Sequence, residues 1–83
     1  MPTDPIAVDA NVLVYGLYQD APQYLASRAI LDRAARGEVE LCFTSQTLAE
    51  FFSIVTSARR VSAPRTPEEA AEVIQSLLAL PGQ

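Results

Sequence analysis

Residues 6–15, Ile-Ala-Val-Asp-Ala-Asn-Val-Leu-Val-Tyr, give the strongest evidence for the fold class. The apolar residues of this stretch fit either one long strand, or a buried strand that ends near Asp9 and is followed by a short helix that Gly16 interrupts or ends. A carboxylate in the middle of a buried strand is costly, whereas at the carboxyl end of a strand it can cap the next helix or meet solvent. Asp9 therefore favours the strand followed by a helix.

A second helix is predicted to begin at residues 20–22, Asp-Ala-Pro, and to stop at Gly37. Proline is pre-set for a first helical turn, and Asp20 suits the positive end of a helix. The spacing predicts an amphipathic helix. Its apolar side holds Tyr24, Leu25, Ala29, Ile30, Leu31, Ala34 and Ala35, and its polar side holds Ser27, Arg28, Asp32, Arg33 and Arg36.

Residues 39–43, Val-Glu-Leu-Cys-Phe, alternate in part and predict a second strand, which runs into a helix cap at Thr44 and Ser45. A third helix is predicted from Gln46 to about Arg60 because apolar residues recur there at helical spacing. These apolar residues are Leu48, Phe51, Phe52, Val55 and Ala58. A polar stripe on the same helix consists of Gln46, Glu50, Ser53 and Ser57.

Residues 61–65 predict a loop, and residues 66–69, Thr-Pro-Glu-Glu, predict a helix start with a capping box. The residues expected on the buried face of this last helix are Ala70, Val73, Ile74, Leu77 and Leu78.

The expected order is strand, helix, helix, strand, helix, helix, which is typical of an α/β layered fold with parallel strands. Two parallel strands are barely stable alone, because a parallel sheet needs neighbours at its edges and cover on both faces. We therefore expect residues 1–83 to form a single domain that is the front portion of a larger fold, or one that a second chain completes.

The composition restricts the chemistry. Ten acidic residues against six arginines give a net charge of −4, which argues against a protein that holds nucleic acid mainly by counterion release. A nuclease is not excluded, since metal sites are built from carboxylates and a bound cation reverses the local sign. The sequence has no His, so serine-triad hydrolysis and His-based zinc chemistry are poor candidates.

Compartment and location follow from two further observations. The one cysteine, Cys42, lies between Leu41 and Phe43 and is expected to be a small buried hydrophobe in a reducing compartment. The first residues carry no basic region or long apolar run, and no stretch is long enough to span a bilayer. We therefore expect a cytoplasmic protein without a membrane partner.

Two acids are candidate metal ligands. Asp9 stands where an apolar strand ends, and Glu50 lies on the polar face of the helix that follows the second strand. In parallel neighbouring strands both carboxylates would lie at one sheet edge, where oxygen ligands suit Mg²⁺ or Mn²⁺. The alternative is that Asp9 and Asn11 only start a helix and that Glu50 is ordinary solvated charge.

The other candidates carry weaker signals. Arg59, Arg60 and Arg65 surround one helix end, where they could complement the helix dipole or contact a phosphate backbone. Three tyrosines could stack on bases, although at their spacing they are expected to frame the packed edge of the first helices; they are Tyr15, Tyr18 and Tyr24.

Three segments together resemble the opening of PIN domains, and especially the VapC-like toxins of bacterial toxin–antitoxin pairs. They are residues 6–15, residues 45–52 (Ser-Gln-Thr-Leu-Ala-Glu-Phe-Phe) and residues 66–70 (Thr-Pro-Glu-Glu-Ala), so the resemblance covers nearly the whole chain. It implies a three-layer α/β/α fold, with the first two strands and about four helices in this chain. The family carries further aspartates in the second half of its domain, and this chain has no acidic residue after Glu72.

The resemblance also implies a function. It is that of a Mg²⁺- or Mn²⁺-dependent endoribonuclease in which Asp9 and Glu50 hold the metal, Asn11 lies at the edge of the site, and Arg59 and Arg60 contact RNA. A homodimer and a cognate antitoxin are the implied partners. The alternative is a catalytically inactive PIN remnant that acts only as a dimerisation or antitoxin-binding module.

Overall fold

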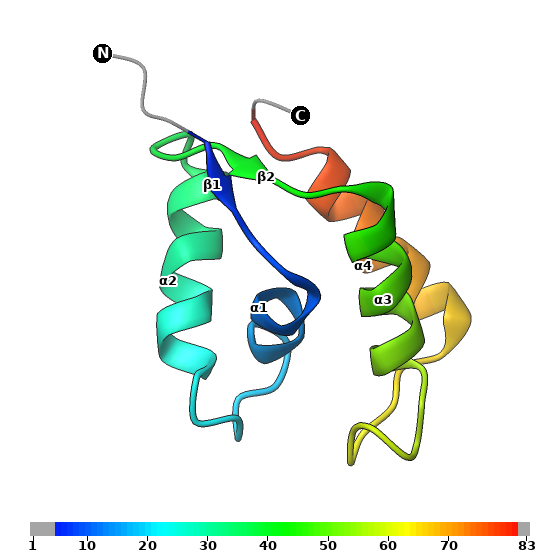
Figure 1. Ribbon diagram of the computed structural model, residues 1–83. Helices are drawn as coiled ribbons and strands as arrows, with labels where there is room; N and C mark the ends of the chain where they lie inside the picture. The colour runs from blue at the N-terminus through cyan, green and yellow to red at the C-terminus, as the bar shows by residue number, and fades with distance from the viewer. Residues whose placement is uncertain (1–4, 82–83) are drawn as a thin grey trace.

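A computed structural model describes residues 5–81 and confirms the predicted order of strands and helices. The elements are β1 (Ile6–Ala7), α1 (Ala10–Tyr15), α2 (Tyr24–Ala35), β2 (Leu41–Cys42), α3 (Ser45–Val55) and α4 (Pro67–Leu78). Helix α2 lies on one side of the two strands, and α3 and α4 lie on the other (Figure 1).

The two strands pair in parallel, as expected, so the chain has an α/β fold. Ile6 is in register with Leu41, and the backbone N–H of Val8 donates to the carbonyl oxygen of Cys42 at 3.1 Å. Strand β2 covers only Leu41–Cys42 and is shorter than the strand predicted over residues 39–43. The pairing stops early because Asp9 and Thr44, just after the two strands, act as the N-caps of α1 and α3. Both helices therefore start from the same edge of the sheet.

Helix α1 confirms the strand-then-helix interpretation of residues 6–15. Asp9 has an extended backbone, and its side chain accepts a hydrogen bond from the backbone N–H of Val12 at 3.0 Å. The helix buries Ala10, Leu13 and Val14.

Helix α2 begins at Tyr24, so the predicted start at residues 20–22 is wrong; the residues before it form turns, and Gln23 makes no side-chain cap. The predicted faces also need correction, because Leu25 is 80% exposed whereas Ser27 is only 5% exposed. Leu25 lies about 120° around the helix from the buried Leu31, since each residue turns the helix by about 100°. The buried face of α2 is therefore narrower than the predicted apolar side, and it includes the small polar residue Ser27.

Helix α3 begins after Thr44, whose hydroxyl accepts from the backbone N–H of Thr47 at 3.1 Å. It ends at Val55, not near Arg60, and the chain turns back until the N–H of Arg65 donates to the carbonyl of Val55 at 2.7 Å. Ala58, expected on the apolar face of the helix, lies in this turn and is exposed.

Helix α4 has the predicted capping box between Thr66 and Glu69. Ala70 and Leu77 are buried, but Leu78 is 51% exposed, which contradicts its predicted place on the buried face. Leu77 is within about 20° of Ala70 around the helix, whereas the next residue is turned about 80° away.

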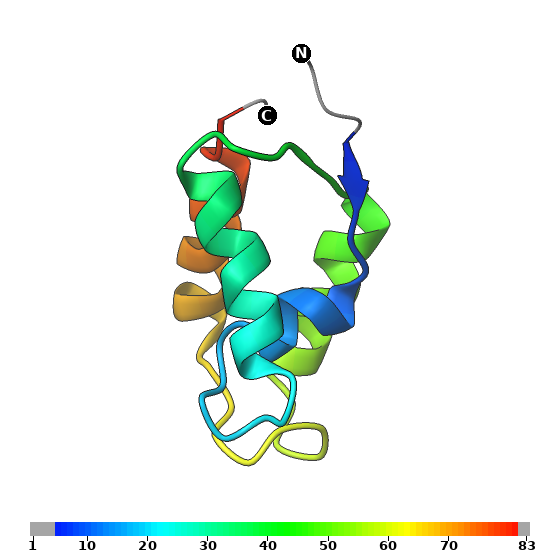
Figure 2. The same ribbon diagram turned by 90° about the vertical axis from the view of Figure 1, so that its left-hand side faces the viewer.

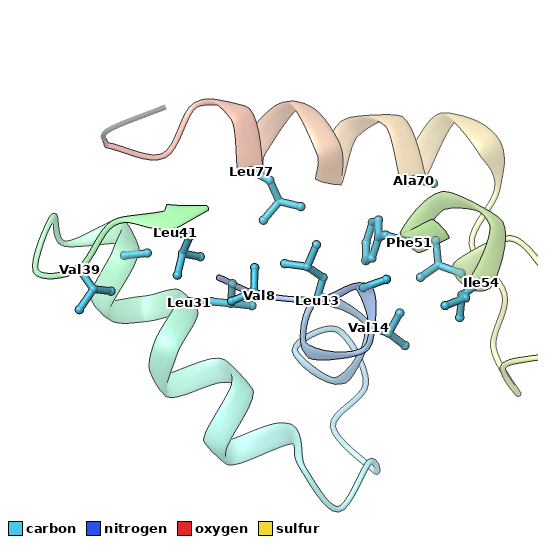
Figure 3. Close-up of a cluster of buried hydrophobic side chains, with 13 residues drawn as sticks. Val8, Leu13, Val14, Leu31, Val39, Leu41, Phe51, Ile54, Ala70 and Leu77 are labelled. Atoms are coloured by element: carbon cyan, nitrogen blue, oxygen red, sulfur yellow. The ribbon is translucent and has the colours of Figure 1, made fainter. Parts of the chain in front are cut away.

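The core joins all these elements. Phe51, Leu13, Leu41 and Val55 are the largest fully buried side chains, and Figure 3 shows Leu13 and Phe51 between α1, α3 and α4. Cys42 is exposed, so the prediction of a buried cysteine is wrong. Successive strand residues point to opposite faces, and Leu41 takes the inward position. None of the helices in residues 5–81 has the length and apolar character needed to cross a membrane.

Glu69→Gln is expected to make the free energy of unfolding less dependent on pH in the acid range. The backbone N–H of Thr66 donates to the Glu69 side chain at 2.9 Å and lowers the pKa of that carboxyl below its ordinary value. The stability contributed by this carboxylate is therefore fully present above its unfolded-state pKa and is lost as pH falls through the lower, folded-state pKa. Urea titrations at a series of pH values measure the effect. Glu68→Gln removes the same charge outside the capping box, and identical pH profiles for the two variants would contradict the prediction.

Candidate metal centre

The first candidate ligand, Asp9, stands at the carboxyl end of β1. Its carboxylate is exposed, and its one hydrogen bond to a described residue is the bond from the N–H of Val12. A carboxylate has two oxygens and about four acceptor positions, so this cap leaves most of its lone pairs available. The capping role and a ligand role are therefore compatible, and the cap fixes where the carboxylate stands.

Glu50 lies in the second turn of α3, about 9 Å along the helix axis from Thr44. It is exposed, and within residues 5–81 it makes no hydrogen bond or ion pair. The adjacent residue, Phe51, is fully buried and anchors the helix in the core, while Glu50 faces solvent.

The packing of α1 on α3 places these two acids on elements in direct contact. In Figure 1 the segment that leads from β1 into α1 crosses toward α3 and comes nearest to it where α1 begins. Asn11 is exposed in the first turn of α1, two residues from Asp9. Residues 5–81 contain no group of three or more His, Cys, Asp or Glu side chains placed to hold a metal ion.

Arg60 comes close to Glu50 although ten residues separate them. Glu50, Ser53, Ile54 and Arg60 line a cavity of about 180 Å³. The turn after Val55 brings the chain back toward Glu50. Nothing in the sequence signalled this turn, because helical spacing predicted a helix as far as Arg60. Arg59 is exposed and does not line this cavity.

The arginines of the chain differ in their partners. Those of α2 and the turn after it are paired: Arg28 with Asp32 at 3.1 Å, and Arg33 and Arg36 with Glu38. The hydrogen bond from Arg36 lowers the pKa of the Glu38 carboxyl. Arg60 has no ion-pair partner in the described part of the chain, so its charge is available to an anion.

A second cavity, of about 190 Å³, adjoins this region and shares Arg60. Tyr15, Tyr18 and Asp20 contribute to its wall from the end of α1 and the loop after it, and Val61 and Ser62 from the loop after α3. The sequence interpretation assigned Asp20 to a helix start, and the later beginning of α2 leaves it at this cavity instead.

The parallel strands, each followed by a helix, make this an α/β fold, and the carboxyl ends of such strands are where α/β proteins commonly bind ligands. Residues 5–81 match the family model described as PIN domain. The chain belongs to the PIN domain family.

The chain is also similar to curated proteins that are named as VapC ribonucleases. The VapC ribonuclease Mb2897 of Mycobacterium bovis and the ribonuclease VapC43 of Mycobacterium tuberculosis are each 34% identical over 76 residues, which are 92% of this chain and 52% of the relative. Ribonuclease VapC24 of Mycobacterium tuberculosis is 32% identical over 72 residues, which are 86% of this chain and 48% of VapC24. The chain thus spans about half the length of these relatives.

Proposed function

We propose that this protein is a metal-dependent endoribonuclease of the VapC type, in which Asp9 and Glu50 hold Mg²⁺ or Mn²⁺. The observation that carries the proposal is a pair of exposed carboxylates, one at the N-cap of α1 and one on α3, which packs against α1, in a chain similar to VapC ribonucleases. A cognate antitoxin, a homodimer and a cytoplasmic location belong to the same proposal and rest on the resemblance to VapC-like toxins.

The donor chemistry fits a hard cation. Both candidate ligands are carboxylates, and Mg²⁺ is commonly held by one or two carboxylates with several waters completing its octahedral shell. When bound, such an ion supplies a water nucleophile near neutral pH and neutralises charge on the phosphate. The carboxylate of Asp9 accepts one backbone hydrogen bond, which holds it in place to act as a metal ligand.

The remaining residues would handle the substrate. The guanidinium of Arg60 shares a cavity with Glu50 and has no ion-pair partner within residues 5–81, so it can donate to phosphate oxygens of an RNA strand. Arg59, exposed beside it, can add a second contact to the backbone. Asn11 lies at the edge of the site and presents an amide that can donate to the substrate or to a water.

Cleavage of single-stranded RNA tests the proposal. Wild-type protein incubated with a labelled RNA is expected to cut internally when Mn²⁺ is present and to leave the RNA intact in EDTA. Glu50→Gln is expected to cleave far more slowly, whereas Glu72→Gln, an exposed glutamate of α4, serves as the matched control with wild-type cleavage. Cleavage that persists in EDTA, or that is equal in Glu50→Gln and wild type, would overturn it.

A further inference from the structure

The cavity between the loops after α1 and α3 has the chemistry of a nucleobase site. These loops cover residues 16–23 and 56–66, and both lie at the end of the molecule away from the strands (Figure 1, Figure 2). The Tyr18 hydroxyl ties them together by donating to the carbonyl oxygen of Ala63 at 3.0 Å. This hydrogen bond links the two loops beside the open cavity that they line.

Its size suits one planar ring. The cavity measures about 190 Å³, below the roughly 300 Å³ at which sites for whole small molecules usually begin. A part of a longer ligand fits this volume better than an independent metabolite does. Arg60 also lines the cavity beside Glu50, so a ligand longer than one ring could extend toward that cavity.

Tyr15 is the available stacking surface. Both Tyr15 and Tyr18 are half-buried at the cavity, but the guanidinium of Arg65 lies 5.6 Å from the centre of the Tyr18 ring and covers one face of it. The Tyr15 hydroxyl makes no hydrogen bond within residues 5–81, so packing rather than a polar contact holds this ring. Stacking of bases on aromatic rings is a common way to bind single strands.

The charged side chains at the cavity, Arg60 and Asp20, would orient a bound nucleotide. Arg60 can hold a phosphate where the two cavities meet, and the exposed carboxylate of Asp20 can only accept hydrogen bonds. Acidic side chains accept from the exocyclic amino group of cytosine, whereas uracil presents a carbonyl oxygen at that position. An amino-bearing base is therefore favoured.

We propose that this cavity binds one unpaired base of the RNA strand, stacked on Tyr15, with its backbone on Arg60 and an amino group directed to Asp20. The site rests on the proposed ribonuclease function, because it places the base next to the bond that Asp9 and Glu50 would act on. Along α1 the two ends, Asp9 and Tyr15, are about 9 Å apart.

Binding in EDTA tests the base site without cleavage. Fluorescence anisotropy with short labelled oligocytidylate and oligouridylate should show tighter binding of the cytidylate by wild-type protein. Tyr15→Ala is expected to weaken binding of both about tenfold or more, while Tyr15→Phe retains it. Tyr24→Ala, a half-buried tyrosine outside the cavity, is the matched control and should bind as wild type does.

Two further variants separate the roles. Asp20→Asn should reduce the preference for cytidylate without loss of stacking, and Arg60→Ala should weaken both ligands and flatten the salt dependence. Equal loss in Tyr15→Ala and Tyr24→Ala, or no RNA binding by wild type, would overturn the base site. The two proposals can fail separately. If Tyr15→Ala binds RNA as wild type does while wild type still shows Mn²⁺-dependent cleavage that Asp9→Asn abolishes, the base site fails and the ribonuclease proposal stands. If Tyr15→Ala weakens binding but wild type shows no Mn²⁺-dependent cleavage, the ribonuclease proposal fails instead.

Discussion

Asp9→Asn is expected to lower the rate of Mn²⁺-dependent RNA cleavage by about 100-fold or more, because it removes one of two carboxylates proposed to hold the cation. The substitution keeps the shape of the side chain, and asparagine caps helices as well as aspartate does. The hydrogen bond from the N–H of Val12 can therefore remain. The rate of cleavage of a labelled single-stranded RNA measures the loss.

The control for this variant is Asp32→Asn, which also changes an aspartate to its amide but lies on α2 in an ion pair with Arg28. It should cleave at the wild-type rate. Circular dichroism of both variants should be that of the wild type, since neither change touches the core. Equal rates for Asp9→Asn and wild type would contradict the assigned site.

Phe51→Ala is expected to reduce the free energy of unfolding by about 3–5 kcal/mol, the usual range when a buried phenylalanine is truncated. Phe51 is 0% exposed and packs where α1, α3 and α4 meet (Figure 3). A domain of this size has a total stability of only about 4–12 kcal/mol at the usual value per residue. The variant should therefore be largely unfolded or unfold at much lower urea, as followed by circular dichroism.

Phe52→Ala is the matched control, because the same truncation is made one residue away at a half-buried position. A smaller loss is expected there, since less apolar surface leaves the core. Phe51→Leu keeps part of the volume and should remain folded, so the loss can be measured even if the alanine variant does not fold. A loss for Phe51→Ala no greater than that for Phe52→Ala would contradict the packing.

Local signals predicted much of the fold. The charged Asp9 separated a strand from a helix within an ambiguous apolar run, and the Thr66 to Glu69 spacing placed the start of α4. Prediction failed where tertiary packing decides. The narrow buried stripe of α2 includes Ser27 and excludes Leu25, and the inward position on β2 went to Leu41, which left Cys42 exposed.

The sequence singled out two candidate site residues, and their shared role stays a prediction. A strand end pointed to Asp9 and the polar face of a helix to Glu50; the structure places Asp9 at the N-cap of α1, which packs against the helix α3 that carries Glu50. The cavity that joins Glu50 to Arg60 was not predicted, because it depends on the turn that ends α3 at Val55. The loop after α3 also lines the second cavity with Tyr15, for which the sequence left base stacking as the weaker alternative to packing.

Binding of Mn²⁺, followed by electron paramagnetic resonance, shows whether Asp9 and Glu50 share one divalent ion. Wild type, Asp9→Asn, Glu50→Gln and the double variant form a cycle. We expect wild type to bind one Mn²⁺, each single variant to weaken binding about tenfold or more, and the double variant to lose little further. Losses that add independently, or single variants that bind Mn²⁺ as wild type does, would contradict it.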